Sequence, residues 1–203
     1  MKKLILIIIL TASCTFTYSQ KKALTFTNTG LFVGQSFRLL ASPRFEFKND
    51  NKGWSIGPTF IVHSESTASD NSYPKLSGLS VSYIHYHYKQ TDKINFFFIT
   101  TSNFQLISNK WKSQIWSEET ASYQSHKYKN DELLITQHLG YGFIYQLTDK
   151  LALSQSVVFG GYYSGTDNNE QSAGAPEIGD TNLSGYNRLG FSWALNLEFK
   201  YTL

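Results

Sequence analysis

Residues 185–203 of the chain read GYNRLGFSWALNLEFKYTL. From Leu189 to Leu203 the odd-numbered positions are apolar or aromatic, whereas the even-numbered positions are small, polar or charged. Successive side chains of a β-strand point to opposite sides of the sheet. This stretch therefore predicts a strand that separates an apolar medium from a polar one.

The same two-sided alternation recurs along the chain, and no segment after residue 20 has convincing helical periodicity. A short first strand is expected over residues 23–28, which brings the number of strands to eight. The other six are expected over residues 31–47, 54–62, 76–88, 94–106, 133–147 and 151–163. In 76–88 the apolar residues change face after Tyr83, which a β-bulge or the end of the buried segment would explain.

The connections between these strands alternate in length after the second strand. Residues 48–53, 90–93 and 148–150 are short and contain Asn, Asp or Gly, which suit tight turns because they tolerate left-handed backbone angles. The links over residues 64–75, 107–132 and 165–184 are long and polar. Short turns at one end and long loops at the other are typical of membrane barrels.

In this pattern the mature chain resembles the small outer-membrane β-barrel proteins of about eight strands. The resemblance implies an all-β fold, a closed antiparallel up-and-down transmembrane barrel over residues 20–203, in the cell outer membrane. In that class the last strand usually ends in an aromatic residue that serves as an assembly signal. Phe199 and Tyr201 fit this pattern, whereas Leu203 departs from the usual terminal Phe.

The N-terminus predicts export. Lys2 and Lys3 precede an unbroken apolar run over residues 4–10, the order of a secretory signal peptide, which we place at residues 1–19. The run is shorter than the roughly 20 residues that span a bilayer, which argues against an uncleaved anchor. Cleavage before Gln20 fits the small residues that precede it, and lipoprotein processing at Cys14, the only cysteine, is the alternative.

The composition narrows the function further. Without Lys2 and Lys3 the chain has 16 basic residues against 15 acidic ones, a balance that gives no reason to expect a nucleic-acid partner. Aromatic residues make up 16% of the chain and charged residues also 16%, below the usual ~25% for charged residues. This composition suits a surface that does not face only water.

A closed barrel would place a set of charged residues inside. An eight-stranded barrel has an interior just wide enough for side chains, so these charges are expected to pair and to plug the lumen. They are Arg38, Arg44, Glu46, Arg188, Glu198 and Lys200.

Aromatic residues near strand ends are expected at the two headgroup levels of the membrane. These are Trp54, Tyr83, Tyr163 and Tyr201. Pro43 and Pro58 fall inside expected strands, where proline is disfavoured because it removes a ladder donor.

Three groups of residues are candidates for hydrolytic or metal chemistry. Ser, His and an acidic group acting together would suit a lipid hydrolase, and the candidates are His63-Ser64-Glu65, Ser125-His126, and His85 with His87. Adjacent strand residues point apart, however, and His138 is expected to be a hydrogen-bonded interior residue. His85 and His87 share a strand face at a spacing that can bind a metal, without an acidic or Cys partner nearby in sequence. We therefore assign no catalytic, cofactor-binding or metal site.

The long links carry the expected function. Residues 107–130 contain Trp111, Trp116, Tyr123 and Tyr128, which would form a recognition surface or pack onto the barrel rim. The sequence predicts a non-enzymatic, monomeric barrel, surrounded by outer-membrane lipid, with a structural, adhesive or surface-interaction role through its loops toward an extracellular ligand or protein. The alternatives are a lipid A or phospholipid-modifying barrel enzyme, a soluble periplasmic β-barrel or sandwich, and a narrow pore.

Overall fold

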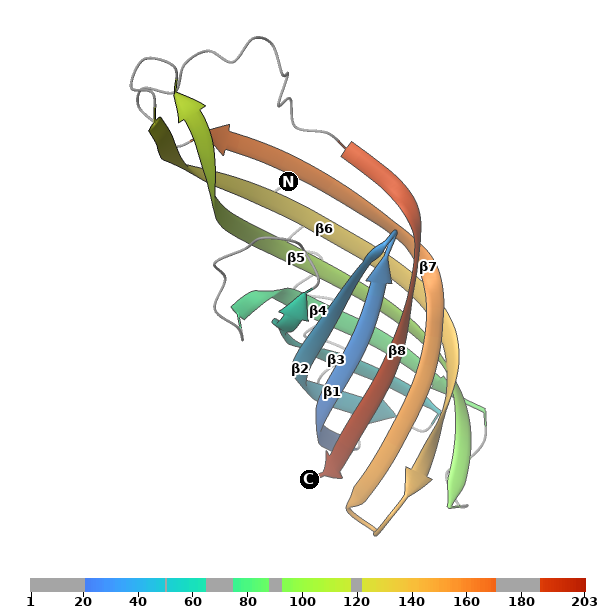
Figure 1. The fold of residues 1–203 in the computed structure, drawn as a ribbon. Coiled ribbons are helices and arrows are strands. Elements are labelled where there is room, and N and C mark those ends of the chain that lie inside the picture. Colours follow the sequence, from blue (N-terminus) through green and yellow to red (C-terminus); the bar gives the residue numbers. More distant parts are fainter. Residues whose placement is uncertain (1–20, 50, 65–74, 88–92, 118–121, 171–186) are drawn as a thin grey trace, which may run out of the picture.

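The computed structural model describes residues 21–49, 51–64, 75–87, 93–117, 122–170 and 187–203. Eight antiparallel strands follow one another around a closed barrel (Figure 1). Their bounds are β1 Lys21–Val33, β2 Ser36–Asn49, β3 Lys52–Ser64, β4 Lys75–Tyr86, β5 Ile94–Ser117, β6 Ser122–Gln146, β7 Leu151–Glu170 and β8 Asn187–Thr202. The prediction of an eight-stranded up-and-down barrel is confirmed.

The barrel closes between its first and last strands. β1 pairs with β8 from Ala23 opposite Thr202 to Val33 opposite Ser192, which leaves neither strand as an edge along this length. Closure matters because an unpaired backbone N–H or C=O group in hydrocarbon costs several kcal/mol. Among the described residues there is no helix long and apolar enough to cross a membrane.

The barrel wall has apolar side chains on its outer face and polar ones on its inner face, which is the reverse of a water-soluble protein. Along β8, Phe191, Trp193 and Leu195 are exposed on the outside, with Phe191 64% accessible, whereas Asn196 and Glu198 are buried inside. An apolar exterior around a polar interior is stable where the surroundings are hydrocarbon. The alternation predicted for residues 185–203 is therefore confirmed from Phe191 to Tyr201, whereas residues 187–190 are exposed at every position.

The first hairpin differs from its predicted form. Residues 31–47 are not one strand, because the chain turns at Gly34 and Gln35, and Gly34 adopts a left-handed φ of 58°. Leu31 and Val33 belong to β1, whose odd-numbered residues point inward, so both are buried in the lumen and not on the predicted outer face. A change of strand assignment moves a side chain to the opposite face.

The change of apolar face within residues 76–88 is also explained differently from the bulge considered in the sequence. β4 pairs with β5 in an unbroken register through Tyr83, and Ile84 and Tyr86 point into the lumen, where both are buried. The register shift lies earlier, where Thr59 and Phe60 of β3 pair with Gly78 and Leu76. Apolar side chains therefore occupy part of the interior.

One end of the barrel is much longer on one side. β5 and β6 remain paired through residues 107–132 as far as Ser117 opposite Ser122, so most of this predicted loop is a β-hairpin that projects beyond β4 (Figure 1). β7 accompanies β6 as far as Tyr128 opposite Glu170. β7 likewise continues to Glu170, past the predicted loop start at residue 165. Residues 65–74, 118–121 and 171–186 of the predicted long links lie outside the described residues, as does the predicted signal peptide.

Candidate functional site: a closed lumen and a projecting hairpin

A buried ion-pair cluster lies in the lumen toward the end with the short turns. The ammonium group of Lys200 lies 2.5 Å from a carboxylate oxygen of Glu46 and 3.9 Å from one of Glu198. The Tyr86 hydroxyl donates to Glu46 over 2.9 Å and accepts from Lys200 over 2.9 Å. Thr27 donates to the other Glu198 oxygen. These contacts join β1, β2, β4 and β8 across the interior.

Two arginines extend the polar network along the lumen. Arg44 donates to the Ser82 hydroxyl over 3.0 Å. Farther along, Arg38 pairs with Glu132 at 2.8 Å, and Ser164 donates to the second oxygen of Glu132. Glu132, predicted at the end of an external loop, is therefore an interior residue that ties β6 to β2 and β7.

The charged residues predicted to lie inside the barrel do so, with one exception. The sequence places Arg188 inside as well, but it is exposed near the start of β8, where the strand extends toward the long-hairpin end. The prediction failed there because strand parity gives the face of a residue but not its height along the barrel axis.

An apolar cluster fills the rest of the lumen. Its members are inward-facing side chains of all eight strands, each at most 8% accessible. They are Leu31, Val33, Leu40, Ile61, Ile84, Tyr86, Phe97, Ile99, Ile107, Leu134, Ile144, Ala152, Val158 and Ala194. The sequence did not predict this cluster, because paired charges were expected to plug the lumen.

The lumen is consequently a packed core. A water-filled channel would leave the polar side chains that line it accessible, yet Glu46, Thr27 and His138 are each 1% exposed. Eight strands enclose little more than the volume of the side chains themselves. The chain is a small membrane β-barrel with a closed lumen.

Only part of the two candidate Ser–His groups lies among the described side chains. His63 lies exposed near the end of β3, the adjacent Ser64 is half-buried, and Glu65 lies outside the described residues. The side chains of Ser125 and His126 are likewise outside the described part of the chain. Nothing in the described geometry joins these residues into a site.

The interior histidine of the barrel is hydrogen-bonded, as expected. His138 Nε2 lies 2.8 Å from the Ser192 hydroxyl oxygen, and both residues are 1% exposed. The other ring nitrogen, Nδ1, has no hydrogen-bond partner among the described residues. A Ser–His pair needs a third group that orients the imidazole for nucleophilic chemistry. This pair therefore has the form of a structural contact inside the core.

The two histidines with metal-like spacing lie among aromatic side chains. His85 and His87 flank the inward-facing Tyr86, and the ring of His87 contacts Phe98 and Tyr141, with centroids 4.6 and 5.5 Å away. Within the described residues no group of three His, Cys, Asp or Glu side chains is placed to hold a metal ion. The surroundings of His87 favour the interpretation that this stretch lies at the membrane interface.

At the other end, the projecting hairpin of the barrel is the largest structured feature beyond the common wall. β4 pairs with β5 only as far as Gly78 opposite Gln105, whereas β5 and β6 continue for twelve further pairs, from Leu106 opposite Leu133 to Ser117 opposite Ser122. The register brings aromatic residues to opposite positions, Trp111 with Tyr128 and Trp116 with Tyr123. The side chains of residues 109–117 and 123–130 lie outside the described ones.

Comparison of this chain with known proteins found similarity to solved structures of membrane barrels. No family model matches the sequence. No curated protein matches it either. Similar solved structures include the N-terminal β-barrel domain of Pseudomonas aeruginosa OprF, with 11% identity, 91% of this chain and 98% of that chain covered, and a TM-score of 0.49.

Two further solved structures have similar values. Neisserial surface protein A shares 10% identity, with 89% and 95% of the two chains covered and a TM-score of 0.46. A major outer membrane protein from Thermus thermophilus shares 14% identity, with 90% and 98% covered and a TM-score of 0.46. The barrel architecture of this chain stands on its own strand pairing.

Proposed function

We propose that the protein is a non-enzymatic surface protein of the bacterial outer membrane, in which the barrel is the anchor and the long-hairpin end contacts an extracellular partner. The observation that carries this proposal is the β5–β6 hairpin, which continues for twelve residue pairs beyond the pairing of β4 with β5. Paired strands hold a projecting segment in a defined shape at little further cost in conformational entropy on binding.

The closed lumen supports the same proposal. A transport role would need an open or openable path, whereas the interior is held by ion pairs from β2 to β6 and β8 and by an apolar cluster. The aromatic residues placed opposite one another in the hairpin belong to the types that contribute most to protein interfaces. An anchor with a structured external extension uses both features.

The test replaces residues 109–130 by an Asn-Gly turn, which closes the hairpin after Ser108 opposite Asp131, three pairs beyond the end of the β4–β5 pairing. Protease added to intact cells should cleave the full-length protein within this segment. They should also adhere more strongly than shortened-hairpin cells to fibronectin- or collagen-coated plates, or aggregate faster with one another. The shortened protein should keep the heat-modifiable gel mobility of a folded barrel.

Two results would contradict the proposal. Cleavage that requires a permeabilised outer membrane would put the hairpin on the periplasmic side. Equal adherence and aggregation of cells with the full hairpin, the shortened hairpin and no protein would remove the interaction role. The membrane barrel itself would stand in either case, because the gel mobility reports it separately.

A further inference from the structure

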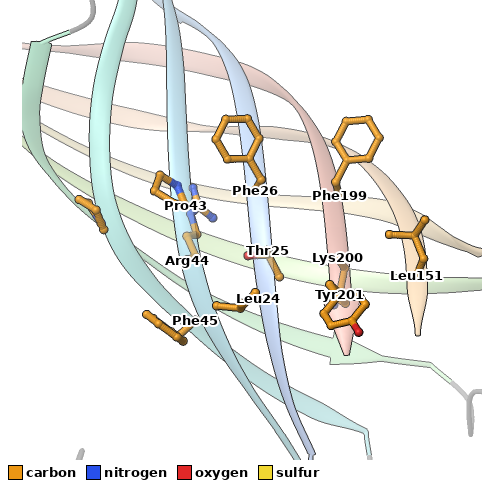
Figure 2. A pocket seen from close by; sticks show the side chains of 11 residues that line it. Leu24, Thr25, Phe26, Pro43, Arg44, Phe45, Leu151, Phe199, Lys200 and Tyr201 are labelled. Atoms are coloured by element: carbon orange, nitrogen blue, oxygen red, sulfur yellow. The ribbon is translucent and has the colours of Figure 1, made fainter. Parts of the chain in front are cut away.

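A concave, apolar groove lies on the outer wall of the barrel, toward the end with the short turns (Figure 2). Its volume is about 530 Å³, within the ~300–1,000 Å³ usual for ligand sites. The lining side chains come from β1, β2, β3, β7 and β8, and the outward-facing ones are almost entirely apolar. These are Leu24, Phe26, Pro43, Phe45, Pro58, Leu151, Phe199 and Tyr201.

Two prolines on neighbouring strands contribute to the hollow. β2 and β3 pair up to Ala41 opposite Phe60 and resume at Phe45 opposite Ile56 in the same register, which sets Pro43 opposite Pro58. Both prolines face outward and are exposed. Their short rings stand beside the large side chains of Phe26 and Phe45, so the wall is recessed where the ladder is interrupted.

Basic residues lie at the short-turn end of the groove. Lys22 is exposed and on the same face of β1 as Leu24, about 7 Å farther along the strand. Its carbonyl accepts from the Leu203 amide, which fixes the backbone beside Tyr201. Lys150 is also exposed and directly precedes Leu151. Asp149 is its acidic neighbour in the same turn.

We infer that this groove binds one anionic glycerophospholipid of the periplasmic leaflet. An acyl chain lies along the apolar recess, and the lipid phosphate accepts hydrogen bonds from the ammonium groups of Lys22 and Lys150. The occupant is a lipid because the groove is continuous with the lipid-facing wall. It is anionic because two lysines stand where the apolar band ends, at the level of the phosphates. The inference rests on the membrane location proposed above.

The experiment is native mass spectrometry of the barrel purified in detergent and exposed to phosphatidylglycerol or phosphatidylcholine. The folded wild type should retain phosphatidylglycerol at least fivefold better than phosphatidylcholine. The double variant Lys22→Gln/Lys150→Gln should lose this preference. Pro43→Phe, which fills the recess and leaves both lysines in place, should lower retention of both lipids.

A matched control separates a site from general charge attraction. Lys52 and Lys93 are exposed lysines beside the short turns. Neither lies within two residues of a groove-lining side chain, whereas Lys22 and Lys150 do. Lys52→Gln/Lys93→Gln should therefore bind as the wild type does. Equal retention of the two lipids by the wild type, or an equal loss in both double variants, would overturn the inference. Gel mobility of each variant reports folding, so failure of the membrane barrel is distinguished from failure of the lipid site.

Discussion

At the scale of single residues, the ion pair between Glu46 and Lys200 has the largest energetic consequence. The Glu46 side chain is 1% exposed and that of Lys200 8%. Removing one partner of a buried pair leaves a charge without compensation, whereas replacing both by apolar groups is often neutral. The pair therefore holds β2 and β8 together with a strength that depends on both members.

The first prediction follows from this asymmetry. Glu46→Gln should lower the free energy of unfolding by about 3–5 kcal/mol. Glu46→Gln combined with Lys200→Met should recover part of the loss and not all of it, because Glu198 also loses its contact with Lys200. Urea titration in lipid vesicles, followed by tryptophan fluorescence, measures both. A Glu46→Gln barrel within about 1 kcal/mol of the wild type would contradict the importance of the pair.

The second prediction concerns Gly34, whose φ of 58° is left-handed. A Cβ atom there would have ordinary space, with the Tyr162 hydroxyl 3.4 Å away, so backbone strain decides the outcome. Gly34→Ala should destabilise the barrel by about 1–2 kcal/mol, and Gly34→Asn by less, because Asn tolerates this conformation. Equal effects of the two substitutions on the urea midpoint would argue against a strained turn.

Residue identity alone predicted the interior contacts only in part. Charges on the polar face of a strand had to pair inside, and the contacts of Glu46, Glu198 and Lys200 confirm this. The sequence did not reveal which charges pair, nor that Leu31 and Val33 would face inward, because an apolar residue suits lipid and a packed lumen equally well. Only the register of the neighbouring strands separates the two.

At the scale of elements, the proline pair interrupts the ladder between β2 and β3. Both prolines lack an N–H at the β2–β3 ladder, and three successive residue pairs between Ala41 and Phe45 are not formed. The pairing of Pro43 with Phe26 of β1 and of Pro58 with Leu79 of β4 continues. The two missing N–H groups therefore both belong to the β2–β3 ladder, and each proline keeps its pairing with the strand on its other side. Two prolines can for this reason lie in the interior of strands.

The third prediction is that replacing both prolines restores the hydrogen bonds between β2 and β3. Pro43→Val/Pro58→Val restores two donors, and each new hydrogen bond should add about 0.5–1.5 kcal/mol to the free energy of unfolding. Amide hydrogen exchange should show new protection at positions 43 and 58. A control substitution, Ala41→Val, changes an outward side chain without adding a donor and should leave exchange in the β2–β3 ladder unchanged. Unchanged stability of the double variant would refute the lost-donor explanation.

Strand number and order could be predicted from the alternation, but strand ends could not. The polar composition of residues 107–132 is typical of a loop, yet most of this segment is paired strand. Beyond the membrane both faces of a strand meet water, so the period-2 contrast disappears while the backbone pairing continues. The boundary at Gly34 was missed for a related reason, since a two-residue turn hardly interrupts the pattern.

At the scale of the whole molecule, the fourth prediction is that the barrel does not conduct ions. Purified barrels inserted into planar bilayers should give no steady unitary conductance, because the lumen is occupied by paired charges and by apolar side chains. A general porin incorporated under the same conditions serves as the positive control. Reproducible current steps from this protein, with a fixed size per insertion, would show that the lumen opens.

The closure of the barrel also sets the order in which it can form. Thr27 of β1 and Glu198 of β8 are hydrogen-bonded across 171 residues of sequence. Bringing such distant segments together has a large entropic cost, and topologies dominated by non-local contacts fold slowly. Hairpins can form early, whereas the ring is completed last. Until then the growing sheet has two edges with unpaired backbone groups, so a chain that stalls before this step is prone to aggregate with other chains.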